Sequence, residues 1–174
     1  MYTYDHPRPA LTVDVVIFTI RTNHLHLLLV RRKQEPFAQM WALPGGFVDI
    51  DEPLNQAAAR ELEEETGVRG VYLEQLYTYG DPDRDPRGRI VTVAYIAFIP
   101  IGEEIHPEGG DDADQARWFS VNELPDLAFD HAKIITDALS RLREKLESNP
   151  KSMLLLPDGF TLDKLQQMKS QKDF

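Results

Sequence analysis

The chain has 174 residues, 42% hydrophobic and 28% charged, a composition typical of one globular domain with its own core. It carries 29 acidic and 19 basic residues, for a formal net charge of -10, so its average field disfavours binding to a polyanion and predicts no nucleic-acid partner. The absence of cysteine excludes a disulfide framework, a thiolate metal site and a cysteine nucleophile. Any metal must therefore bind oxygen or imidazole ligands.

The amino terminus shows no targeting signal. Residues 1–10 lack the cationic start and apolar run of a signal peptide, and the apolar stretch 11–20 is interrupted by Asp14 and is too short to span a bilayer. We therefore expect a cytoplasmic protein with no membrane partner.

The first half of the chain begins with two predicted strands. Residues 11–20 and 25–30 are rich in β-branched and aliphatic side chains, and the turn-like segment between them predicts a β-hairpin. Residues 34–51 mix turn formers with the pair Gly45-Gly46, which indicates backbone that needs positive φ or a close approach. We expect a structured loop with short strand pieces there.

A helix is predicted over residues 53–66. Pro53 opens the helical pattern and Gly67 closes it, which matches the preference for proline in the first turn and glycine just past the last. The order strands, helix, strands, helix predicts an α/β (α+β) fold in which a mixed sheet packs between helices. We expect one domain over residues 1–148, a partly helical or disordered extension over 149–174, strands at 71–79, 89–99 and 116–121, and a second helix at 130–147.

The predicted helix at 53–66 carries carboxylates where apolar side chains are expected. At about 100° per residue its apolar face includes Leu54 and Leu62, and Glu61 and Glu65 fall inside the same arc, with Glu64 at its edge. Like charges at this spacing repel each other, and the helix dipole disfavours anions in the carboxyl-terminal turns. A bound divalent cation reverses each of these penalties, and oxygen ligands favour Mg²⁺ or Mn²⁺.

A simpler interpretation stays open at this point. An ordinary acidic amphipathic helix, with Arg60 pairing with Glu64 one turn later, requires no metal. The shared arc of glutamates and leucines argues against it, because a solvated face lies opposite the apolar one.

The same helix lies within a recognisable motif. Residues 46–68 resemble the Nudix signature at every fixed position, namely Gly46, Glu52, Arg60, Glu61, Leu62, Glu64, Glu65, Gly67 and Val68. The resemblance extends loosely to about residue 147. It implies an α/β/α sandwich with a mixed sheet and hydrolysis of a nucleoside diphosphate linked to another group.

The resemblance also implies roles for individual residues. Metal ligation falls to Glu61, Glu64, Glu65 and the main-chain carbonyl of Gly45, with Mg²⁺ or Mn²⁺ as the cofactor. Arg60 and Glu52 are implied as supporting residues, Arg60 through ion pairs that orient the glutamates. Many relatives are dimers, so a homodimer is one expected state.

The catalytic base is less well defined. In family members the catalytic base comes either from the signature itself (the box, here residues 46–68) or from a loop before the last strand. In this chain that loop carries Glu103, Glu104, Glu108, Asp111 and Asp112. Asp112, with its neighbour Asp111, is the preferred candidate outside the box. A solvated acidic turn explains the same residues equally well.

A second loop points to the substrate. Residues 79–89 (YGDPDRDPRGR) resemble the corresponding loop of ADP-ribose pyrophosphatases in the family, in which a proline stands at the place of Pro82. Arginines are suited to bidentate binding of phosphate, and tyrosines on one strand face can stack on adenine or simply belong to the core. The candidate substrate-binding residues are Arg32, Tyr77, Tyr79, Pro82, Arg84, Arg87 and Arg89.

Two alternatives to an ADP-ribose hydrolase stay open. Residues 154–167 resemble a segment that introduces the winged-helix domain of Nudix-derived transcriptional regulators, which predicts a nucleotide-sugar sensor. That class is expected to have a degraded box and a basic carboxyl-terminal domain, whereas this box matches throughout. The other alternative is a hydrolase that removes unwanted nucleoside triphosphates, which needs base-specific contacts.

Overall fold

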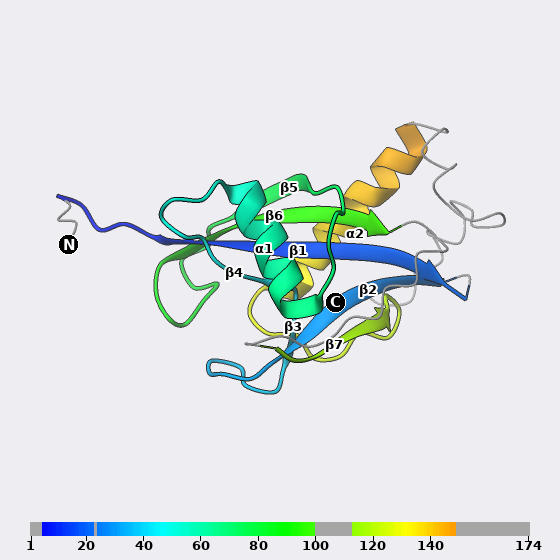
Figure 1. The fold of residues 1–174 in the computed structure, drawn as a ribbon, viewed down its shortest axis with the longest axis horizontal. Helices are drawn as coiled ribbons and strands as arrows, with labels where there is room; N and C mark the ends of the chain where they lie inside the picture. The colour runs from blue at the N-terminus through cyan, green and yellow to red at the C-terminus, as the bar shows by residue number, and fades with distance from the viewer. Residues whose placement is uncertain (1–4, 23, 100–112, 149–174) are drawn as a thin grey trace.

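Two helices flank a mixed sheet in the computed structural model, which describes residues 5–22, 24–99 and 113–148 (Figure 1). The predicted α/β order and the helix positions are confirmed, although the strand expected from residue 71 begins at Glu74. The elements of these ranges are β1 Ala10–Arg21, β2 His24–Arg32, β3 Trp41–Ala42, β4 Gly45–Phe47, α1 Leu54–Thr66, β5 Glu74–Tyr79, β6 Ile90–Ile99, β7 Ala113–Ser120 and α2 His131–Ser148.

Strand β1 lies at the centre of the sheet. It forms the predicted antiparallel hairpin with β2, pairs in parallel with β6, and pairs antiparallel with the short strand β4. The outer pairs, β2 with β7 and β5 with β6, are also antiparallel. Because β1 is covered on both faces, its sequence is a nearly continuous apolar run rather than an alternating one.

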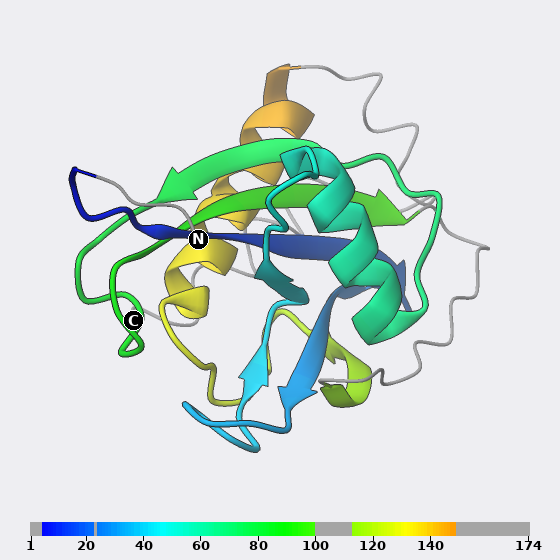
Figure 2. The same cartoon turned by 60° about the vertical axis from the view of Figure 1, so that its left-hand side comes forward.

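The side chains of β1 divide between two apolar layers on opposite faces of the sheet. Val13, Val15 and Ile17 belong to the layer that packs against α1, whereas Val16 and Phe18 belong to the layer that packs against α2. Figure 2 shows the two helices on opposite sides of the sheet. The sheet that contains β1 therefore forms the middle layer of an α/β/α sandwich, as predicted.

Helix α1 has the boundaries that its flanking residues predict. Pro53 precedes it with extended backbone, and Gly67 follows in the left-handed conformation at φ 73°, where its N–H donates to the carbonyl of Glu63 at 2.8 Å. The segment 149–174, predicted as an extension, lies outside the described residues. Within the described ranges no helix is both long and apolar enough to cross a bilayer.

Candidate active site

The glutamates of α1 lie at two depths. Glu61 and Glu65 are half-buried beside the fully buried Leu62, whereas Glu63 and Glu64 are exposed. The helical spacing predicted this difference, because Glu61 and Glu65 fall in the apolar arc. Two carboxylates are therefore held at the surface of the core.

One arginine binds three of the nearby carboxylates. Arg60 donates to both oxygens of Glu52 at 2.5 and 3.1 Å, to Glu61 at 2.8 Å and to Glu64 at 3.1 Å. Hydrogen bonding from Arg60 lowers the pKa of Glu52, and its bond to Glu52 raises the pKa of the arginine itself. Arg60 also donates to the carbonyl of Phe47 at 3.1 Å, so it links α1 to the end of β4.

The two glycines of β4 bring backbone against the half-buried glutamates. The N–H of Gly45 donates to Glu65 Oε2 at 2.9 Å. A Cβ at Gly46 would lie 2.5 Å from the carboxylate of Glu61, and one at Gly45 would lie 2.1 Å from the carbonyl of Val13. Neither position has room for a side chain, which explains the glycine pair that the sequence showed. Burial raises the pKa of Glu61 even though Arg60 opposes that change.

A cavity of about 460 Å³ opens beside these glutamates, within the size range of small-ligand sites. Carboxylates outnumber cationic side chains in its lining by six to five, so the lining has no positive surplus with which to hold a pyrophosphate. The carboxylates are Asp14, Glu35, Asp49, Glu61, Glu65 and Asp85, and the cations are Arg32, Lys33, Arg60, Arg84 and Arg87.

The chemistry of the donors fits a hard divalent cation. Glu61 and Glu65 supply carboxylate oxygens at the cavity, burial raises the pKa of Glu61, and the β4 backbone at Gly45 and Gly46 also lines the cavity. Among the described residues no three acidic or histidine side chains already converge on one point, because Glu61 and Glu64 turn to Arg60 and Glu65 turns to Gly45. Metal ligation by these residues stays a prediction.

A buried polar network forms another part of the cavity wall, which sequence reasoning missed. Asp14, 7% exposed on β1, accepts a hydrogen bond from Thr92 at 2.6 Å and lies 3.7 Å from Arg84 and 3.4 Å from His131. Arg84 in turn donates to both oxygens of Asp130 at 2.7 and 3.0 Å. The carboxylates of this network each face a cation or a hydrogen-bond donor.

His131 connects this network to the loop before β4. Its Nδ1 accepts a hydrogen bond from the N–H of Leu43 at 2.9 Å, so its Nε2 carries the proton and faces Asp14. Burial lowers the pKa of His131 below the usual 6.5, although the charge of Asp14 opposes that shift. A neutral histidine thus holds the backbone two residues before Gly45.

The predicted substrate residues separate into two groups. Arg32 and Arg84 line the cavity, as does Arg87. Tyr79, Pro82 and Arg89 do not line it: the Tyr79 hydroxyl faces α2 and donates to Asp137, and Arg89 folds back onto the carbonyl of Gly80. The alternation along β5 predicts a shared face for Tyr77 and Tyr79 but does not indicate which layer that face meets.

The predicted base in the acidic loop lies outside the described residues. Glu103, Glu104, Glu108, Asp111 and Asp112 all fall within residues 100–112. Their part in catalysis stays a prediction.

Comparisons with known proteins agree with this fold and site. The NUDIX domain model matches residues 9–138. An ADP-ribose pyrophosphatase of Methanocaldococcus jannaschii is 44% identical over 74% of this chain and 72% of its own length. An ADPR-responsive transcriptional repressor, NtrR, of Acinetobacter baylyi is 39% identical over 93% of this chain, which spans 66% of that relative.

A solved structure gives the same result. The NUDIX domain of Shewanella oneidensis NrtR, crystallised with ADP ribose, superposes with a TM-score of 0.72 at 40% identity, covering 80% of this chain and 94% of that one. The match to the domain model extends over most of the chain, and the glutamates of its signature lie beside the cavity. The chain belongs to the Nudix family.

Proposed function

We propose that this protein is a divalent-metal-dependent hydrolase that cleaves the diphosphate bond of ADP-ribose to give AMP and ribose 5-phosphate. The observation that carries the proposal is the pair of half-buried glutamates, Glu61 and Glu65, at the wall of a cavity without positive surplus. Such a cavity binds a pyrophosphate only if cations accompany the substrate.

Glu61, Glu64, Glu65 and the carbonyl of Gly45 would hold Mg²⁺ or Mn²⁺. When bound, such an ion neutralises pyrophosphate oxygens and lowers the pKa of a coordinated water. Arg60 already contacts Glu61 and Glu64, so it orients these carboxylates. Glu52 in turn fixes Arg60 from the other side.

Three arginines outside α1 bind and orient the substrate. Arg32, at the end of β2, and Arg84 and Arg87, in the loop between β5 and β6, all line the cavity. Arg84 is held in place by Asp130, and Arg87 donates to both oxygens of the buried Asp85. Hydrogen bonds from Arg87 hold the pKa of Asp85 below its usual value in spite of burial, so this pair is charged at neutral pH.

The choice of ADP-ribose is supported by relatives. A 44% identical relative is an ADP-ribose pyrophosphatase, and a 40% identical Nudix domain was crystallised with ADP ribose. The loop around Pro82 resembles that of such hydrolases.

A homodimer is proposed as the oligomeric state.

A second function has its own support. A repressor is 39% identical to this protein over 93% of this chain, and this similarity supports a role as a regulator that senses ADP-ribose. The two functions differ in turnover, since a sensor binds ADP-ribose without hydrolysing it.

A substrate panel with Mg²⁺ tests both functions. ADP-ribose, NADH, diadenosine polyphosphates and oxidised nucleoside triphosphates are compared by chromatography of the products. We expect ADP-ribose to be turned over fastest and to give AMP and ribose 5-phosphate in equal amounts. Tight binding of ADP-ribose with no product would reject the hydrolase in favour of the sensor, and preferential hydrolysis of a triphosphate would reject the substrate.

A further inference from the structure

Four side chains form an arginine–aromatic cluster along the cavity. The guanidinium carbon of Arg87 lies over the ring of Phe47 at 5.1 Å and over the ring of Phe129 at 5.2 Å, and that of Arg32 lies over Phe129 at 4.8 Å. These residues come from β4, the loop before β6, the segment before α2 and the end of β2. All four line the cavity.

One hydrogen-bonding edge of each guanidinium, formed by Nε and Nη2, is engaged within the chain. Arg87 donates through Nε and Nη2 to the carboxylate of Asp85, and Arg32 donates through Nε and Nη2 to the carbonyls of Pro36 and Gln34. A guanidinium anchored by this edge is held with its flat face against the neighbouring rings. Flat cationic and aromatic surfaces bind a planar ring better than a tetrahedral phosphate.

Phe129 lies at the centre of the cluster and has an unfavourable backbone conformation. Its backbone is left-handed, with φ 54°, a region that residues with a side chain seldom adopt. Phe37, also left-handed at φ 65°, packs edge-to-face against it with ring centroids 4.9 Å apart. Backbone of this kind persists where surrounding contacts enforce it, and it concentrates at functional sites.

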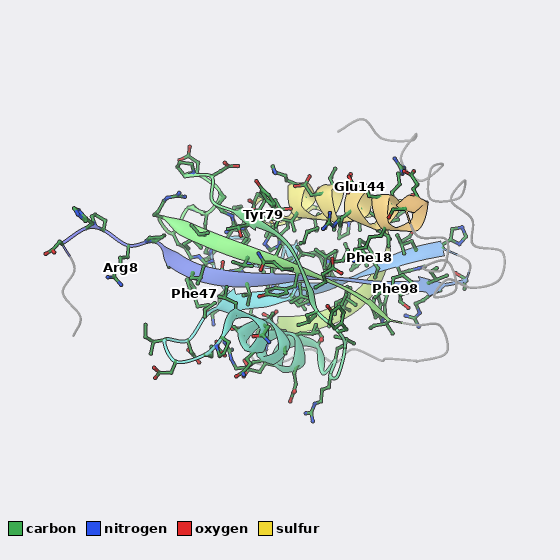
Figure 3. The ribbon with its side chains drawn as sticks, turned by 90° about the horizontal axis from the view of Figure 1, so that it is seen from above. Arg8, Phe18, Phe47, Tyr79, Phe98 and Glu144 are labelled. Atoms are coloured by element: carbon green, nitrogen blue, oxygen red, sulfur yellow. The ribbon has the colours of Figure 1, made fainter. Side chains whose placement is uncertain are left out.

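Phe47 is the accessible end of the cluster. It lines the cavity yet is 46% exposed, and Figure 3 labels it at the end of the sheet opposite Phe98. The only described aromatic side chains more exposed among large hydrophobics are Tyr72 and Tyr77, and neither lines the cavity. An open ring at the cavity wall, supported from behind by a guanidinium, is a surface on which a ring can stack.

We propose that the arginine–aromatic cluster is the nucleobase subsite, with the base of the substrate stacked on the exposed ring of Phe47 and with Arg87 supporting that ring from behind. The inference rests on the proposed function in that it takes the ligand to be a nucleotide. It assigns the adenine to this end of the cavity and leaves the diphosphate to the glutamate wall. The charge of Arg87 contributes through its planar surface.

Calorimetric titration of the full chain with two probes, AMP and ribose 5-phosphate, in the same Mg²⁺ buffer tests this assignment. Wild type is expected to bind AMP more tightly than ribose 5-phosphate. Phe47→Leu, which keeps an apolar side chain but removes the ring, is expected to weaken AMP binding about tenfold and to leave ribose 5-phosphate binding unchanged. Phe47→Tyr retains a ring and is expected to bind AMP like wild type.

Two further variants keep the test specific. Tyr72→Leu removes an exposed ring outside the cavity and is the matched control, expected to change neither affinity. Arg87→Lys keeps the charge but loses the flat surface, so it is expected to weaken AMP binding selectively as well.

Three results would overturn the inference: equal weakening of both probes in Phe47→Leu, unchanged AMP binding in that variant, or no preference of wild type for AMP. The outcome is separable from that of the proposed function. If ADP-ribose is not hydrolysed but AMP binding still depends on Phe47, the hydrolase is rejected and the base subsite stands.

Discussion

Two groups of charged side chains border the same cavity and differ in how far their carboxylates are compensated: two share one arginine in the buried network, whereas three share one on α1. In the buried network, Arg84 lies between the carboxylates of Asp14 and Asp130, and Asp14 also faces Thr92 and His131. On α1 the single Arg60 serves Glu52, Glu61 and Glu64 together.

The buried network stabilises the fold, whereas the α1 carboxylates are the charges proposed to bind a ligand. A network whose members are compensated inside the chain requires no ligand and fixes the positions of β1, α2 and the loop at Leu43. A group with surplus negative charge at a half-buried helix face is stabilised further by added cations. Variants in the two groups should therefore affect different properties.

The largest expected effect is on turnover. Glu65→Gln removes one negative charge from the glutamates of α1 that line the cavity but keeps an oxygen that can accept from Gly45, so we expect turnover of ADP-ribose to fall by about 100-fold or more with the fold intact. Steady-state kinetics and circular dichroism measure the two properties.

Glu63→Gln is the matched control for that variant. Glu63 is exposed on the same helix and pairs with Arg69, away from the cavity lining. We expect it to keep near-normal turnover. Near-normal turnover of Glu65→Gln instead would show that the α1 carboxylates do not serve catalysis.

The next effect is on stability and belongs to the buried network. Arg84→Met leaves Asp14 and Asp130 without their cation, which should lower the free energy of unfolding by about 3–5 kcal/mol. Denaturant titration measures this loss. Lys133→Met, which breaks the exposed pair with Asp137, should cost less than about 1 kcal/mol. Similar losses in the two variants would remove the distinction between a compensated network and surface pairs.

The smallest effect concerns pH. Burial keeps His131 neutral in the folded state, so the unfolded chain takes up a proton below about pH 6.5 that the folded chain does not. The free energy of unfolding should therefore fall as pH drops below that value, by up to about 1.4 kcal/mol per pH unit from this group.

His131→Asn keeps an acceptor for the Leu43 N–H and removes the titrating ring. The free energy of unfolding of this variant should therefore change less between pH 7.5 and 5.5 than that of wild type, by up to about 1.4 kcal/mol per pH unit below 6.5. An identical slope in His131→Asn and wild type would mean that folding does not lower the pKa of this histidine.

Local signals in the sequence predicted one of the two groups and missed the other. The ends of α1 follow from Pro53 and Gly67, and the depth of Glu61 and Glu65 follows from helical spacing. These signals depend only on residues that are close together in the chain, so they can be recognised from the sequence alone.

The buried network depends on contacts between distant segments. Leu43 and His131 are 88 positions apart, and no local periodicity brings them together. The one available signal was Asp14, a charged residue inside an apolar strand, which a buried position permits only with partners. The positions of Tyr79 and Arg89 away from the cavity likewise depend on how β5 and its loop pack.

Thermal unfolding during titration with Mg²⁺ and with Mn²⁺ tests most directly whether the α1 carboxylates are kept for a cation. Wild type should gain several degrees in midpoint as the ion reaches millimolar concentration, because a ligand of the folded state stabilises it by mass action. The Glu61→Gln/Glu65→Gln double variant should start at an equal or higher midpoint without metal and gain little. No shift in wild type, or the same shift in the double variant, would contradict the proposed metal site.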